Sequence, residues 1–213
     1  MKKNRKILCL GIGLLAAFAI WTALLYWVDV QPIGPRNSCV GFATVNGFFH
    51  DLTGVHMWLY TVTDWLGLVP IAVCLCFGVL GLAQWICRKR IGKVDSDILV
   101  LGGMYLVTMA VYVLFEQFVV NYRPILIAGY LEASYPSSTT LLVMCVMPPA
   151  FMQCSARMRH GVFRSLMRIG IITFVVFMVL GRLISGVHWL SDIIGGALFS
   201  AGLNVIYYAI TKQ

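Results

Sequence analysis

Six apolar stretches divide this sequence, and they constrain its fold more than any other feature. An apolar stretch of about 20 residues is long enough to cross the roughly 30 Å hydrocarbon core of a bilayer as a helix. The expected spans cover approximately residues 7–28, 66–87, 98–119, 139–154, 169–184 and 193–210. The pattern therefore predicts an all-α fold, a polytopic bundle of six transmembrane helices, in which residues 1–213 form a single membrane-embedded domain.

The composition excludes a soluble protein. Of the residues, 60% are hydrophobic and only 11% are charged, with a mean hydropathy of +0.87. Soluble domains carry roughly 25% charged residues. The net charge of +8 could favour nucleic acid as a partner, but the basic residues form short clusters between apolar runs and not one basic face. We expect no nucleic-acid partner, and the bilayer as the surroundings of the chain.

The first apolar run resembles a secretory signal peptide, because four basic residues precede it. The apolar core of a signal peptide is about 7–15 residues long and ends at a small-residue cleavage site. The run over residues 7–28 is longer and ends at Trp27, Val28 and Asp29. We therefore expect it to remain as a span.

The distribution of Lys and Arg predicts the orientation of the spans. If the N-terminus is cytoplasmic, 13 of the 16 basic residues lie on the inner side, and only Arg36, Arg123 and Arg182 lie outside. The positive-inside rule then places both termini in the cytoplasm. The inner residues are Lys2, Lys3, Arg5, Lys6, Arg88, Lys89, Arg90, Lys93, Arg157, Arg159, Arg164, Arg168 and Lys212. A bacterial plasma membrane is the expected location.

The outer segment of residues 29–65 is the largest piece outside the expected spans. Within it, residues 40–52 mix aromatic and aliphatic side chains with Asn46, His50 and Asp51. This mixture suits a helix lying in the membrane interface. An ordered loop explains it equally well.

Two of the outer arginines stand at the ends of spans, where a charged residue is costly and suggests a function. Arg123 follows the third span, and Arg182 ends the fifth. His188 comes six residues after Arg182, and Asp192 follows one helical turn later. Because positions i and i+4 share a helix face, we expect Asp192 to accept a hydrogen bond from one nitrogen of His188. That bond would leave the other nitrogen free to react.

A run of hydroxyl residues opens the fourth span on the same side of the membrane. Ser137, Ser138 and Thr139 stand where unpaired backbone N–H groups of a helix N-terminus attract anions. With the two arginines and the histidine, they predict a cradle for a tetrahedral anion beside a nucleophile. In the alternative interpretation, the arginines reach lipid phosphates, and the His–Asp pair only caps a helix.

These residues fall into three motifs with fixed spacing: Glu116-x6-Arg123-Pro124, Pro136-Ser137-Ser138-Thr139 and Gly181-Arg182-x5-His188-x3-Asp192. In order and spacing they resemble the motifs of the type-2 phosphatidic acid phosphatase and vanadium haloperoxidase superfamily. There the motifs read Lys-x6-Arg-Pro, Pro-Ser-Gly-His and Ser-Arg-x5-His-x3-Asp. The resemblance covers nearly the whole chain.

The resemblance implies a hydrolase of lipid phosphates or diphosphates that uses no metal and no cofactor. The predicted topology places its site at the extracytoplasmic face. In this family's mechanism, His188 would attack phosphorus and become a phosphohistidine, while Asp192 orients it. Arg123, Arg182 and Ser137 would hold the equatorial phosphoryl oxygens.

Three of the departures from the family pattern bear on the chemistry of the site. Glu116 replaces the motif-one lysine, Thr139 replaces the motif-two histidine that serves as general acid, and Gly181 replaces a serine. Loss of a general acid typically costs about 10²–10⁴ in rate, and an alcohol leaving group would suffer most. A diphosphate releases an already stable anion, so we expect a preference for polyprenyl or lipid diphosphates.

Glu116 allows two interpretations. It lies two turns before Arg123, so an ion pair with Arg123 or with Arg182 would explain it. Alternatively, Glu116 supplies the missing acid. Ser138, next to Thr139, is a further residue of the modified site.

Two other functions remain open at this stage. A catalytically silent relative would bind lipid phosphate head groups without hydrolysing them, as the two motif losses suggest. A lipid transporter or flippase would use the arginines to bind a head group. The sequence identifies neither the lipid nor the oligomeric state.

Overall fold

The computed structural model describes residues 2–158 and 161–212. These residues form eight α-helices, two short 3-10 turns and isolated β-bridges only. The helices are α1 (Lys2–Leu24), α2 (Ala43–Thr53), α3 (Met57–Leu66), α4 (Leu68–Arg88), α5 (Ser96–Gln117), α6 (Ser138–Arg157), α7 (Val162–Ile184) and α8 (Leu190–Thr211). The prediction of an all-α, polytopic membrane bundle is confirmed.

Six helical segments of the described chain are long and apolar enough to cross a membrane. Five of them correspond to α1, α5, α6, α7 and α8. The remaining segment joins α3 and α4 into 32 residues, Met57–Arg88, because Gly67 between them keeps helical angles. It starts earlier than the expected residue 66, inside the segment that we had assigned to the outer side. The added part of the helix contains Asp64, which pairs with Arg182 on α7 at 2.8 Å.

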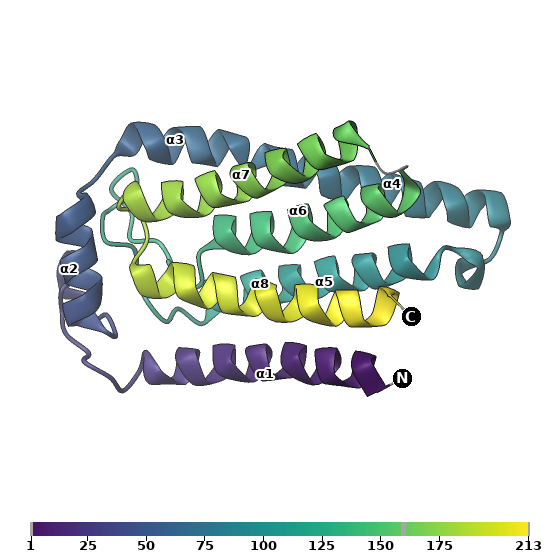
Figure 1. The fold of residues 1–213 in the computed structure, drawn as a ribbon. Helices are drawn as coiled ribbons and strands as arrows, with labels where there is room; N and C mark the ends of the chain where they lie inside the picture. The colour runs from purple at the N-terminus through teal and green to yellow at the C-terminus, as the bar shows by residue number, and fades with distance from the viewer. Residues whose placement is uncertain (1, 159–160, 213) are drawn as a thin grey trace.

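The long helices run side by side, and α2 lies across one end of the bundle (Figure 1). Both termini lie at the opposite end (Figure 1). The central helices are α6 and α8, which pack against each other, while α1 packs mainly against α8. The loops that carry the three motifs all lie at the α2 end, which we call the motif end.

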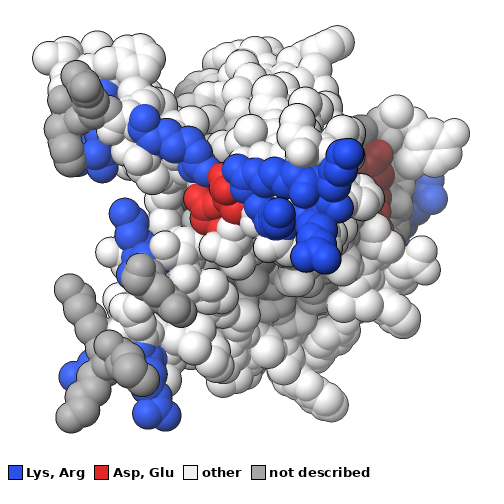
Figure 2. Space-filling model, turned by 90° about the vertical axis from the view of Figure 1, so that its right-hand side faces the viewer, with Lys and Arg blue, Asp and Glu red and all other residues white. Residues whose placement is uncertain are grey.

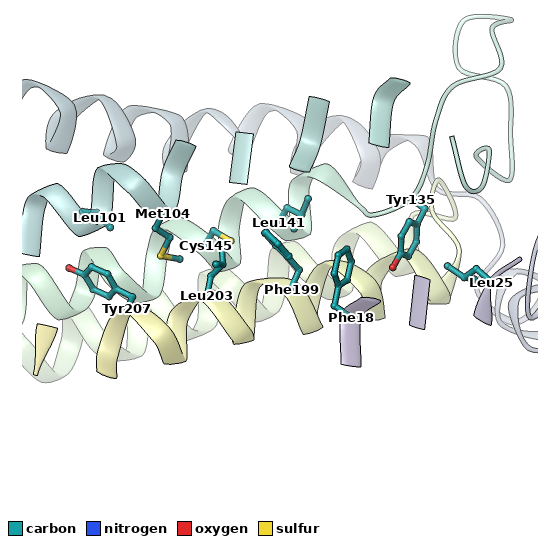
Figure 3. Close-up of a cluster of buried hydrophobic side chains, with 10 residues drawn as sticks. All are labelled: Phe18, Leu25, Leu101, Met104, Tyr135, Leu141, Cys145, Phe199, Leu203 and Tyr207. Carbon is teal, nitrogen blue, oxygen red and sulfur yellow. The ribbon is translucent and has the colours of Figure 1, made fainter. Parts of the chain in front are cut away.

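A cluster of buried aromatic and aliphatic side chains fills the space between α1, α5, α6 and α8 (Figure 3). Tyr135, just before α6, belongs to this cluster and is 2% exposed. Its ring occupies the space above Gly195, where an added Cβ would lie 2.4 Å from Cε2. Its hydroxyl lies 2.6 Å from Oγ1 of Thr22 on α1. The chain entering α6 is therefore fixed between α1 and α8, next to the motif end.

The terminal end of the bundle carries grouped Lys and Arg side chains (Figure 2). Three ion pairs tie part of this group to the start of α5. Arg88 pairs with Asp95 at 2.7 Å, and Arg157 pairs with Asp97 at 3.3 Å and with Asp95 at 3.8 Å. Arg159 lies outside the described residues. The grouping agrees with the charge pattern from which we predict a cytoplasmic side.

The outer segment of residues 29–65 contains the helix α2, which is one of the two structures that we expected there. On α2, Val45, Phe48 and Leu52 are exposed, whereas Asn46 is buried against α8. The exposed apolar residues are three and four positions apart and share one helix face. This helix covers the motif end from outside (Figure 1).

Candidate functional site

Three of the predicted site residues come together at the motif end from different parts of the chain. Arg123 lies in the loop between α5 and α6, Arg182 in the last turn of α7, and His188 between α7 and α8. Nη1 of Arg123 lies 3.5 Å from Nε2 of His188. The guanidinium carbons of Arg123 and Arg182 lie 6.0 Å and 4.8 Å from the ring centre of Tyr60 on α3. The two cations therefore lie against one tyrosine ring, and Arg123 also contacts the imidazole.

A short antiparallel pairing within the α5–α6 loop positions the contacts to His188. The backbone N–H of Arg123 donates to Glu132, and that of Ser134 donates to Asn121, at 3.0 Å and 2.9 Å. Arg123 and Ser134 thus stand on opposite arms of the pairing. Arg123 approaches one ring nitrogen of His188, and Ser134 approaches the other.

The hydrogen bonds of His188 determine which nitrogen carries the proton. Nδ1 lies 3.1 Å from the carbonyl oxygen of Ser134, which can only accept, so Nδ1 donates. Nε2, facing Arg123, then keeps its lone pair. His188 is 4% exposed, and burial lowers its pKa to about 4. The side chain is therefore a neutral imidazole at neutral pH, and its unprotonated Nε2 accepts a long hydrogen bond from Nη1 of Arg123.

The expected direct hydrogen bond from His188 to Asp192 is absent in this part of the structure, because Nδ1 and Oδ2 lie 3.8 Å apart. His188 precedes α8, so the two residues do not share a helix face as we had assumed. The Asp192 carboxylate turns instead to the helix start, where Oδ2 accepts the backbone N–H of Trp189 at 2.9 Å. Ser134 lies between the two groups and donates its hydroxyl to Oδ2 at 2.5 Å.

The other carboxylate oxygen of Asp192 is held by neighbours that the sequence did not single out. Oδ1 accepts the side-chain amide of Asn121 at 3.2 Å. Ser191, the residue before Asp192, is bound by Asn46 of α2. The backbone N–H of Ser191 donates to the Asn46 side chain at 3.0 Å, and the Ser191 hydroxyl accepts from it at 2.9 Å. The helix that covers the motif end therefore helps to fix the start of α8.

Arg182 is almost completely buried, with 4% of its surface exposed. Its Nη2 atom donates to Oδ1 of Asp64 at 2.8 Å, and Tyr60 covers its plane. Nε and Nη1 have no hydrogen-bond partner within the described residues. Buried polar groups normally find a partner, so these N–H groups are suited to bind an anion.

The predicted ion pair of Glu116 with an arginine is wrong. Arg123 pairs with Glu132, with Nε 3.1 Å from Oε2, and Arg182 pairs with Asp64. Because α5 ends at Gln117, Glu116 and Arg123 do not lie on one helix. No ion pair within residues 2–158 and 161–212 joins Glu116 to either arginine.

Glu116 instead lines a small pocket together with His188. Ser134 and Ser138 also line this pocket, whereas Thr139 is buried in the first turn of α6. Beside the imidazole, where the family's acid is missing, the structure thus places Glu116 and Ser138. Among the described residues, no three His, Cys, Asp or Glu side chains are grouped to hold a metal ion.

Ser137 begins α6. It is completely buried, and its hydroxyl accepts bonds from the backbone N–H and the hydroxyl of Thr140 at 3.4 Å and 3.1 Å. Its backbone N–H donates to the carbonyl of Asp192 at 3.2 Å. Ser137 therefore joins the first turns of α6 and α8, and its hydroxyl caps α6.

Gly181 permits the close contact between α3 and α7. A Cβ atom at this position would lie 2.7 Å from Cγ2 of Thr63, closer than real Cβ atoms come. The serine usual in the family motif would therefore displace α3. The close approach brings Tyr60 and Asp64 onto Arg182.

Sequence reasoning missed five neighbours of the site: Asn46, Tyr60, Asp64, Asn121 and Ser134. Asp64 gave the clearest signal, because it is an acid within an apolar helical stretch, where ionisable residues are usually functional. The remaining four carry no pattern that distinguishes them from ordinary loop or interface residues.

Comparison with known proteins supplies an independent observation. The PAP2 superfamily matches residues 73–213 of the chain. The structure is similar to the crystal structure of a transmembrane PAP2-type phosphatidylglycerolphosphate phosphatase from Bacillus subtilis. That protein is 18% identical, the match covers 94% of each chain, and the TM-score is 0.59. A search of curated proteins gives no significant match.

Proposed function

This chain belongs to the PAP2 superfamily, and we propose that it is a membrane phosphohydrolase acting on lipid phosphates or diphosphates. The observation that supports this most directly is the 3.5 Å separation between Nη1 of Arg123 and the unprotonated Nε2 of His188. A nucleophile and a phosphate ligand at this distance can engage the same phosphoryl group. Arg182, beside the same Tyr60 ring, supplies the second cation.

The proposed reaction has two displacement steps. Nε2 of His188 attacks phosphorus, the bond from phosphorus to the leaving oxygen breaks, and a phosphohistidine forms. Arg123 and Arg182 bind the equatorial oxygens, over which charge is spread in the transition state. Water then attacks phosphorus, the phosphorus–nitrogen electron pair returns to Nε2, and phosphate leaves. No metal takes part in this proposal.

Ser137 has a more limited role in the proposal than its motif implies. Its hydroxyl is engaged in capping α6. We assign its contribution to the position of the first turn of α6, whose N-terminal dipole favours a bound anion. Asp192 acts in the proposal by orienting His188.

We propose diphosphates, such as polyprenyl diphosphates, as the preferred substrates. Thr139, at the usual place of the general acid, is a buried residue of α6 that carries no acid. A phosphate leaving group needs less protonation than an alkoxide, so it suffers less from this loss. Comparing kcat/KM for a polyprenyl diphosphate and for phosphatidic acid tests the preference, and equal values would refute it.

We place the reaction at the extracytoplasmic face of a plasma membrane. The motif end lies opposite the terminal end, where the basic side chains are grouped (Figures 1 and 2). The positive-inside rule assigns that basic end to the cytoplasm. In a chain whose native cysteines are replaced by serine, because Cys39 is itself exposed, labelling of cysteines introduced at exposed Arg36 and Lys93 by an impermeant reagent on intact cells tests this. Only the Arg36 position should react.

Trapping of the covalent intermediate tests the central proposal. The purified protein is mixed with substrate labelled in the terminal phosphate and quenched rapidly in alkali, in which phosphohistidine survives. We expect label on His188 in the unaltered chain and none in His188→Ala. Absence of label from both proteins, with substrate unchanged, would overturn the proposed hydrolysis.

The second candidate function is binding of lipid phosphate head groups without turnover. It is favoured by one specific observation, the two buried N–H groups of Arg182 that lack a partner within the described residues. Binding alone does not require an oriented imidazole, however. Equal affinity of the unaltered chain and His188→Ala for a lipid phosphate, without label in either, would favour this function.

A further inference from the structure

The hydroxyl of Ser134 lies between the imidazole of His188 and the carboxylate of Asp192. Its oxygen is 3.0 Å from Nδ1 and 2.5 Å from Oδ2. The imidazole and the carboxylate are themselves 3.8 Å apart, beyond hydrogen-bond distance. We propose that Ser134 is a positioning residue through which Asp192 acts on the nucleophile. This inference rests on the proposed phosphohistidine mechanism.

The direction of the hydrogen bonds follows from the chemistry of the groups. An ionised carboxylate can only accept, so the Ser134 hydroxyl donates its hydrogen to Asp192. Its oxygen lone pairs then face Nδ1–H of His188. The result is a chain of donors from imidazole to hydroxyl to carboxylate. Each bond in such a chain polarises the next.

Asp192 is held in a position from which it reaches Ser134 and not His188. Oδ2 also accepts the backbone N–H of Trp189, and Oδ1 accepts the amide of Asn121. Asp192 is completely buried. Moving its carboxylate toward Nδ1 would break these bonds. The hydroxyl of Ser134 therefore carries the only short link between the two groups among the described residues.

The link matters most when the phosphoryl group is transferred. As Nε2 bonds to phosphorus, the ring gains positive charge, and Nδ1–H becomes a stronger donor. A hydroxyl polarised by Asp192 is a better acceptor for that hydrogen than an isolated hydroxyl. The same contact holds the plane of the ring toward Arg123. Outer hydrogen-bond partners of metal-binding histidines typically contribute about 10–100-fold to activity, and we expect an effect of the same size for the partner of His188.

The backbone of Ser134 makes it possible to test the link to Asp192 without moving the proton from Nδ1 of His188. Its carbonyl oxygen also accepts Nδ1–H, at 3.1 Å, and its own N–H is paired with Asn121. A Ser134→Ala change removes the hydroxyl but keeps both backbone bonds. The variant therefore keeps the proton on Nδ1 and loses only the connection to Asp192.

Single-turnover labelling of His188 tests the proposal. We expect Ser134→Ala to slow phosphohistidine formation about 10–100-fold, with KM close to that of the unaltered chain, because Arg123 and Arg182 still bind phosphate. The matched control is Ser200→Ala on α8, which removes another completely buried hydroxyl, contacted by Cys145 at 3.3 Å. In Ser200→Ala, His188 should become labelled at the same rate as in the unaltered chain. An unchanged labelling rate in Ser134→Ala would overturn the proposal.

A double-mutant cycle shows whether Ser134 acts through Asp192. If it does, Ser134→Ala combined with Asp192→Asn should label no more slowly than Asp192→Asn alone. If the two losses multiply, Ser134 acts independently and the proposal is wrong. Thermal unfolding of each variant in detergent identifies any that fails to fold, and Ser134→Thr, which restores a hydroxyl, should recover most of the rate.

A measurement without substrate distinguishes failure of this inference from failure of the proposed hydrolysis. Nitrogen NMR of His188 reports its titration directly. Ser134→Ala should lower the His188 pKa further, because Asp192 then stabilises the imidazolium less. The other charged groups near the ring, Arg123, Arg182 and Glu116, are the same in both proteins. An unchanged titration would count against the link whether or not the chain hydrolyses a lipid.

Discussion

The guanidinium of Arg123 approaches His188 at Nε2, with Nη1 3.5 Å away, while the opposite side of the ring is occupied by the chain's own hydrogen bonds. The only ring nitrogen left for chemistry is thus the one next to a cation. A phosphoryl group attacked by Nε2 would lie within reach of the guanidinium. The arrangement suits attack on an anionic centre, which repels a nucleophile unless its charge is neutralised.

Replacing this guanidinium by an ammonium tests the relationship. Arg123→Lys should lower kcat/KM by about 10²–10³, because a lysine cannot reproduce the planar, two-pronged contact to a phosphoryl group. Steady-state hydrolysis measures the effect. Arg36→Lys is the control, since Arg36 is exposed at the same end and its side chain donates to the carbonyl of Gly129 at 3.2 Å. Similar losses in both variants would contradict the specific role of Arg123.

Asp64→Asn should weaken substrate binding. The carboxylate holds Nη2 of the buried Arg182 at 2.8 Å, and a misplaced phosphate-binding group can cost up to about 10² in kcat/KM. We expect KM to rise, with kcat less affected. Asp51→Asn, which removes an exposed charge from α2, should change neither value. A lower KM in Asp64→Asn would show that the carboxylate competes with phosphate instead of positioning the arginine.

Gly181→Ala should separate α3 from α7. The new methyl group would lie 2.7 Å from Cγ2 of buried Thr63, and overpacking of this kind typically costs about 1–3 kcal/mol. Thermal unfolding in detergent should show the loss of stability, and KM should rise as for Asp64→Asn. Gly170→Ala on the same helix meets no atom within 4 Å and should leave both unchanged. Equal behaviour of the two variants would refute the packing argument.

The pKa of His188 predicts the acid limit of activity and stability. Burial lowers it to about 4 from the ordinary value of 6.5. Between these values the unfolded chain binds a proton at His188 that the folded chain does not, so stability should decrease as the pH falls from 6.5 to 4. Unfolding of His188→Gln in detergent should depend less on pH over this window. For activity, log(kcat/KM), corrected for ionisation of the substrate, should stay level down to about pH 5.

Glu116→Gln tests whether this carboxyl group supplies the missing acid. Glu116 lines the pocket beside His188 and is free of the ion pair that the sequence suggested. If it protonates the leaving oxygen, kcat for a monoester should fall by about 10²–10⁴, and kcat for a diphosphate should fall less. Measuring kcat across pH for both substrates distinguishes the cases. Unchanged values throughout would exclude the acid role.

The sequence predicted the membrane bundle and the meeting of the motifs because both depend on strong physical patterns. Apolar runs of bilayer length and the clustering of Lys and Arg gave the spans and placed three motifs at one end. The spacing of Arg182 and His188 across one turn between helices gave the centre of the site. These features need no knowledge of side-chain packing.

What the sequence missed depends on contacts between distant segments. Asp64 stands out as an acid in an apolar stretch, but its partner Arg182 becomes evident only when α3 packs against α7. Ser134 has no distinguishing pattern until the α5–α6 loop folds back on itself. The assumption that His188 and Asp192 share a helix face failed because α8 begins only at Leu190. The Asp192 carboxylate instead accepts a backbone N–H at the start of α8, and the hydroxyl of Ser134 contacts the imidazole ring.

The close packing of α3 on Gly181 has a consequence for how this chain has diverged. The family match begins at residue 73, within α4, whereas Tyr60 and Asp64 precede it. Homologues could share every motif residue with this chain and still surround the same arginine with a different aromatic and acidic wall. Under the proposed function, substitutions confined to the first 72 residues therefore suffice to change the surroundings of Arg182, while Arg123 and His188 stay the same.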